Sequence, residues 1–167
     1  MQIRIFIVTV LAVCVFAGCG GPPRPAGLPP LFPCDITIIQ EGQPLEGALV
    51  RLIPESGVSE WAISGKTNAN GVAIISTALF RGAPEGTFKV LVSKTDVTPS
   101  QHTEPEDINS PEWEGWNALV VTERRHTVMF VKPEYDQVRT TPHSITITKG
   151  RNQQTFDVGE PVAIRID

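Results

Sequence analysis

The chain has little of what most catalytic sites require. Its 167 residues include only three cysteines and three histidines, and His102, His126 and His143 are far apart in the sequence. It contains no His-Glu-x-x-His zinc motif, Gly-x-Ser-x-Gly elbow, glycine-rich phosphate loop or Cys-x-x-Cys pair. These absences predict a protein that is not an enzyme and that has no metal or other cofactor.

An excess of positive charge is also missing. The chain has 14 Lys and Arg against 18 Asp and Glu, which gives a net charge of −4. Binding to nucleic acid needs clustered basic side chains that contact phosphates, so we expect no nucleic-acid partner. Beyond the first residues, no apolar run approaches the length of about 20 residues that spans a bilayer.

The first residues follow the pattern of an export signal. A short basic stretch, Met1–Arg4, precedes the apolar run Ile5–Ala17, which is too short to span a membrane. The run leads to Gly18 and Cys19, and small residues before a cleavage point suit a signal peptidase. This segment resembles the lipobox of bacterial lipoproteins, with Phe16 where the pattern prefers leucine.

That resemblance implies that residues 1–18 are a signal peptide and that Cys19 carries lipid, including palmitate-type acyl chains. Two or three chains suffice for stable anchoring, because each buried methylene contributes about 0.8 kcal/mol. The expected location is the cell envelope, with the membrane as a partner, and Gly20 favours the outer membrane or a periplasmic face. An ordinary secretory signal and a cytoplasmic protein with an apolar first strand are the alternatives.

A proline-rich tether is expected to follow, at residues 19–33. Residues 20–33 contain six prolines and three glycines. Proline fixes φ and lacks an amide donor, so this stretch suits neither a helix nor a central strand. The remaining residues, 34–167, are of a size suited to one domain.

Short apolar-alternating runs separated by turn residues fill this domain, and no run of helical period stands out. The runs expected to be strands are 35–40, 48–53, 61–67, 72–77, 87–93, 118–122, 127–131, 144–148, 153–158 and 162–166. They predict an all-β fold, a single Ig-like or transthyretin-like antiparallel β-sandwich of about seven to nine strands. The strongest turn signal is the segment Asn68–Gly71, and Trp61 is expected in the core. Cys34 is expected to be a buried residue at a strand start, with a reactive thiol as the alternative.

Three segments resemble the carboxypeptidase regulatory-like (transthyretin-like) β-sandwich family. They are PLEGALV at 44–50, GKTNANGVA at 65–73 and PEGTFKV at 84–90. Asn68 stands where the family usually has Asp, and Phe88 where it usually has Tyr. SITITKG at 144–150 and the segment Phe156–Val158 are similar to the closing hairpin of small lipoproteins frequent in planctomycetes. This resemblance implies a folding, spacing or binding module and not a hydrolase.

One long polar segment, residues 94–117, is predicted to be a loop. Its middle carries Glu106 and Asp107 among five acidic residues with no Lys or Arg between them, and Trp113 and Trp116 follow. Three interpretations stand: a solvated acidic loop, a Ca²⁺ site unlike an EF-hand, and a surface for a ligand or partner protein. Alternatively, the two indoles cover an open end of the sandwich.

Two functions follow from these features. The first is a non-catalytic, membrane-anchored envelope lipoprotein whose β-sandwich is a structural or binding module for an envelope protein. The second is a carbohydrate-binding module at the cell surface, which uses the Trp-containing acidic loop 94–117 to bind polysaccharide. A hydrolase with residues scattered in sequence ranks last, because triads need no local motif.

Overall fold

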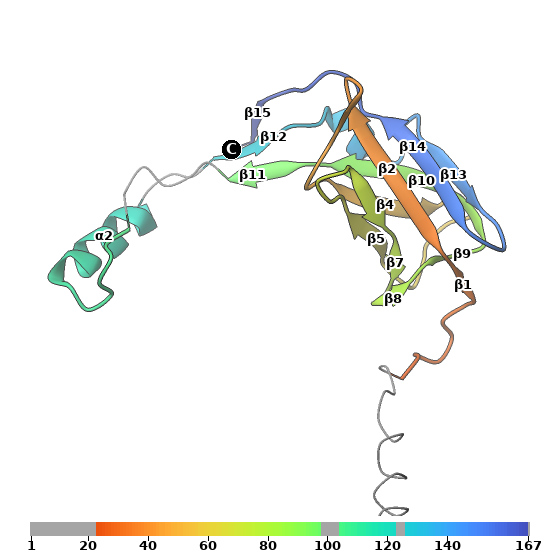
Figure 1. Cartoon of the computed structure of the whole chain (residues 1–167), viewed down its shortest axis with the longest axis horizontal. Coiled ribbons are helices and arrows are strands. Elements are labelled where there is room, and N and C mark those ends of the chain that lie inside the picture. The colour runs from red at the N-terminus through yellow and green to blue at the C-terminus, as the bar shows by residue number, and fades with distance from the viewer. Residues whose placement is uncertain (1–22, 98–103, 123–125, 167) are drawn as a thin grey trace, which may run out of the picture.

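The computed structural model describes residues 23–97, 104–122 and 126–166, and their fold is mostly β. Figure 1 shows strands stacked in a sandwich, with one short helix set apart from it. The expected all-β sandwich is therefore confirmed. The signal peptide at 1–18 and the lipidation residue Cys19 lie outside the described residues.

Two sheets form the body of the sandwich. The larger sheet has the order β13 (Ser144–Ile147), β10 (Gly86–Ser93), β4 (Leu49–Pro54), β5 (Ile63–Lys66), β7 (Ser76–Thr77) and β8 (Phe80–Arg81). The facing sheet comprises β14 (Asn152–Asp157), β2 (Cys34–Gln40), β3 (Gln43–Pro44) and β6 (Val72–Ile74).

Two smaller sheets and two short helices complete the described elements. They are the pair β1 (Leu31–Phe32) and β9 (Ala83–Pro84), the sheet β11 (Thr95–Val97), β12 (Thr127–Met129) and β15 (Ile164–Ile166), the 3-10 helix η1 (Pro133–Asp136), and α2 (Pro111–Thr122). The strands exceed the expected seven to nine because many are only two or three residues long. The expected strand at 72–77, for example, is divided into β6 and β7.

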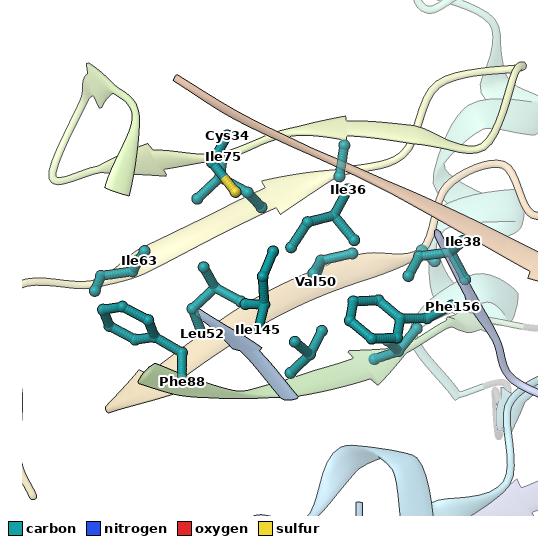
Figure 2. Close-up of a cluster of buried hydrophobic side chains, with 14 of the residues drawn as sticks. Cys34, Ile36, Ile38, Val50, Leu52, Ile63, Ile75, Phe88, Ile145 and Phe156 are labelled. Atoms are coloured by element: carbon teal, nitrogen blue, oxygen red, sulfur yellow. The ribbon is translucent and has the colours of Figure 1, made fainter. Parts of the chain in front are cut away.

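The core fills the space between the two main sheets. Alternate residues of strands such as β4 and β13 point inward, as period-2 patterning requires. Figure 2 shows the side chains of Ile36 and Ile38 on β2 facing Val50 and Leu52 on β4. All four are at most 1% exposed. Phe156 and Ile145 join this layer from β14 and β13.

The turn Asn68–Gly71 forms as predicted. The Asn68 side-chain oxygen accepts hydrogen bonds from the amides of Asn70 and Val72, at 2.9 and 3.1 Å. Gly71 has a φ of +72°, in the left-handed region that glycine adopts without strain. Local turn chemistry therefore decides this part of the fold, and the turn brings β6 beside β2.

Two expectations about strand pairing are wrong. β14 pairs with β2 in parallel, so the sandwich is not purely antiparallel. β13 and β14 do not form a closing hairpin: β13 pairs with β10 in the larger sheet, and β14 pairs with β2 in the facing sheet. The exposed connection at residues 148–151 therefore passes from one sheet to the other at the end of the sandwich. In this way the inward faces of both strands meet the same apolar interior.

Two further expectations about secondary structure are corrected. Residues 118–122 are not a strand but the second half of α2. Pro111 begins this helix, and Glu112 and Glu114 in the first turn complement the positive end of its dipole. The tether also ends earlier than expected, because Leu31–Phe32 forms β1, which pairs with β9. The Phe32 side chain packs on the core, which ties this part of the chain to the sandwich.

Candidate functional site

The segment predicted as a long acidic loop is partly regular structure. β11 occupies its beginning and α2 its end. Asp107 lies in the turn before the helix, where its carboxylate accepts a 2.9 Å hydrogen bond from the Asn109 amide. Its carbonyl accepts another from the amide of Ser110, at 3.0 Å. Asp107 therefore shapes the start of the helix, whereas Glu106 is exposed to solvent.

Trp113 and Trp116 lie three residues apart on α2, so they share one face of the helix. Their ring centroids are 4.9 Å apart at an interplanar angle of 35°, and both residues are half-buried. In Figure 1 the helix stands away from the sandwich. The indoles therefore shield one another and do not close an end of the sandwich. We call the side chains of Trp113 and Trp116 the indole pair.

Acidic side chains are frequent beside the indole pair, but the structure gathers no ligand set there. Among residues 23–97, 104–122 and 126–166, no three His, Cys, Asp or Glu side chains are grouped so that they would hold a metal ion. The Ca²⁺ interpretation consequently gains no geometric support from these residues.

An apolar groove lies on the larger sheet. It has a volume of about 420 Å³ and lies over the outer side of β4 and β5 and the loop between them. Leu49, Ile53 and Val58 contribute apolar walls, and Trp61 lies beside them. Pockets that bind small molecules are commonly of this size and this apolar.

The expectation that Trp61 belongs to the core is wrong. It precedes β5 and is half-buried at the wall of the groove. The hydroxyl of Ser59 accepts a hydrogen bond from the Trp61 amide, at 3.1 Å, and donates one to its carbonyl, at 2.7 Å. These two bonds hold the chain in a tight bend. The bend keeps the indole out of the strand and therefore out of the interior.

Arg51 is the charged group of the groove, and no sequence motif pointed to it. Its Nη2 lies 2.5 Å from Oδ1 of Asp136, which is 85 residues away in η1. Its Nε is buried and has no hydrogen-bond partner within the described parts of the chain. A buried donor without a partner is costly to the folded state.

Cys34 is buried, as expected, at the start of β2 and with no exposed surface. Burial, together with the negative charge of the neighbouring Asp35, raises the pKa of its thiol to about 12. A thiol with this pKa stays protonated at neutral pH, and the thiolate is the nucleophilic form. Cys34 is consequently a buried core residue, as the strand pattern predicted.

Comparison of the chain with protein-family models, with curated proteins and with solved structures finds no match. No helix within the described residues is long and apolar enough to cross a membrane.

Proposed function

We propose that the protein is a lipid-anchored envelope protein whose β-sandwich is a non-catalytic binding module. The small residues before Cys19 and the proline-rich segment after it support the anchor. The arrangement of the domain supports the role in binding. In Figure 1 the segment at 23–30 joins the sandwich on the side of β1, whereas α2 and the small sheet of β11, β12 and β15 lie on the other side.

This arrangement is the observation that carries the proposal. A domain held by its N-terminal side displays the opposite side to the surroundings. The half-buried indole pair lies on the displayed side, and Trp is enriched where proteins bind partners. The groove beside Trp61 adds a second, apolar surface nearer to the tether.

Metabolic labelling with palmitate tests the anchor. We expect wild-type protein to incorporate label and Cys19→Ala to incorporate none, because the thioether forms on that sulfur. Cys14→Ala is the matched control, since it removes a cysteine from the same N-terminal segment and should leave labelling unchanged. Equal incorporation by wild type and Cys19→Ala would contradict the lipid anchor.

Carbohydrate binding by the indole pair is the second candidate function. Two indoles on one helix face, 4.9 Å apart, offer apolar ring surfaces that stack on sugar rings. In polysaccharide pull-down assays we expect wild type to bind, and we expect Trp113→Ala/Trp116→Ala to lose most of this binding. Trp61→Ala, which changes an indole outside α2, is the control that should retain it. Binding that survives loss of both helix indoles excludes this candidate.

A further inference from the structure

Two fully exposed apolar side chains mark one edge of the sandwich. Val58 is 100% exposed and Leu79 is 94% exposed, the highest values among the large hydrophobic residues described. Val58 lies in the loop between β4 and β5, and Leu79 lies in the turn between β7 and β8. Water-exposed apolar groups of this size, when they gather on one surface, commonly mark a site of protein or membrane interaction.

The two turns lie next to each other. Pairing of β5 with β7 places Ile63 opposite Thr77, and the Ala78 amide donates a 3.0 Å hydrogen bond to the carbonyl of Ala62. A second hollow, lined by Ala62, Ala78 and Leu79 among others, adjoins the Trp61 groove and shares Ala62 with it. Val58, Trp61 and Leu79 therefore belong to one continuous surface.

The backbone of the turn that presents Leu79 is strained. Ala78 and Leu79 have φ values of +51° and +129°, which residues other than glycine rarely adopt. Such strain costs about 1–3 kcal/mol per residue and is concentrated at functional sites. Within the described chain, this strained turn ends in a side chain that is 94% exposed, so burial of Leu79 in the domain does not account for it.

This surface lies on the side where the chain joins the sandwich. The β7–β8 turn leads through Arg81 directly into β9, which pairs with β1 at the end of the tether. Figure 1 shows β7, β8 and β1 on the same side of the domain, and the segment at 23–30 leaves from that side. A lipid anchor at the N-terminus therefore keeps Leu79 and its neighbours near the bilayer.

Arg81 follows the β7–β8 turn, and a shared carboxylate links it to Arg151. Arg151 contacts Oδ2 of Asp35 at 2.8 Å, and Arg81 approaches Oδ1 at 3.6 Å. The side chain of Arg81 is 62% exposed and that of Arg151 is 65% exposed, whereas that of Asp35 is 7% exposed. Two guanidinium groups thus share one buried carboxylate. Their remaining N–H groups face solvent, where they would donate hydrogen bonds to a lipid phosphate.

From these observations we infer that this edge, comprising Val58, Trp61, Leu79, Arg81 and Arg151, docks on the surface of the membrane that holds the tether. The inference rests on the proposed lipid anchor. The occupant is the bilayer interface: the apolar tips enter the boundary between head groups and acyl chains, and the indole lies at head-group level. Exposed Glu60 and Glu85 on nearby turns offset much of the basic charge. Docking is accordingly expected to depend more on the apolar tips than on anionic lipid.

Depth-dependent fluorescence quenching tests this docking. The full lipidated chain, with Trp113→Phe and Trp116→Phe so that Trp61 is the remaining indole, is reconstituted into vesicles of phosphatidylcholine with some phosphatidylglycerol. Nitroxide lipids labelled at the head group or at mid-chain are the quenchers. We expect stronger quenching of Trp61 by the head-group label, because the indole lies at that level.

Val58→Ser/Leu79→Ser should lower the ratio of docked to undocked domains by roughly tenfold, since two apolar side chains no longer leave water. Val97→Ser/Ile166→Ser is the matched control. It also changes two exposed apolar residues, which are 50% and 42% exposed, but these lie on the small sheet away from the tether. This control should leave quenching unchanged.

The outcomes separate docking from anchoring. Protein that floats with vesicles but shows no lipid quenching of Trp61 overturns docking and leaves the anchor intact. Quenching that persists in Val58→Ser/Leu79→Ser also overturns it. Protein that fails to float with vesicles, with no palmitate label, overturns the anchor instead. If Trp61 becomes shielded from solvent without vesicles when the protein concentration is raised, a second copy of the chain covers the edge. This result overturns docking on the membrane.

Discussion

Gly71→Ala is expected to destabilise the domain by about 3 kcal/mol. An alanine at this position must adopt the observed φ of +72°, which costs about 1–2 kcal/mol for an L-residue. Its Cβ would also lie 2.5 Å from the carbonyl oxygen of Ile38 and 3.2 Å from the Leu45 nitrogen. Both neighbours are backbone atoms, so relief of this clash requires the turn to move away from β2. The free energy of unfolding in urea measures the effect.

Gly42→Ala is the matched control for this prediction. Gly42 has a nearly identical φ of +76°, but a Cβ there meets no atom within 4 Å. We therefore expect only the conformational cost, about 1 kcal/mol. Equal losses of stability in the two variants would show that the close approach of Gly71 to β2 is unimportant.

Leu52→Ala is expected to cost about 3 kcal/mol of stability. Leu52 is 1% exposed, sits opposite Val90 in the pairing of β4 with β10, and points into the core. Truncation removes buried apolar surface and leaves a cavity between the two sheets, which rigid neighbouring strands fill only in part. The same urea measurement, with an unchanged dependence on urea concentration, reports this loss.

Leu49→Ala supplies the comparison within the same strand. Leu49 is 42% exposed on the outer side of β4, at the wall of the groove. Its truncation should change stability by less than about 1 kcal/mol, because much of the side chain is already exposed to water and its removal leaves no closed cavity. A loss as large as that of Leu52→Ala would mean that the groove is packed in solution and is not an open surface.

The edge that carries Val58 and Leu79 and the indole pair on α2 lie on different sides of the domain. This separation assigns them different tasks under the proposed anchor. Under the proposed docking, the edge would orient the domain on the membrane, and the indole pair would stay available to a partner. Loss of either one should therefore leave the other measurable, since the two surfaces share no residue.

Local sequence patterns determined much of the fold. Alternating apolar residues predicted the strand Cys34–Gln40 to within one residue, because one face of it is continuously buried. Asn68 and Gly71 predicted their turn, because both the side-chain cap and the left-handed φ are properties of single residues. Burial of Cys34 followed from its place in the same strand pattern.

Tertiary structure decided what depends on distant parts of the chain. Local pattern cannot set the direction of β14 beside β2, because parallel and antiparallel strands present similar side chains to a core. It also cannot place Arg51 beside Asp136, which lies 85 residues further on. The helix at 111–122 replaced an expected strand, because the same apolar residues suit either structure when no neighbouring strand pairs with them.

The exposed edge that carries Val58, Trp61 and Leu79 is another feature that the sequence alone did not predict. Sequence alone placed Trp61 in the core, since a large apolar residue in an alternating run usually packs inward. Only the folded chain brings its loop beside the turn of Leu79 and places both near β1. The individual strands and turns were thus determined by local chemistry. Which side chains were left exposed together was decided by packing of the two sheets, because packing alone selects which apolar groups the interior accommodates.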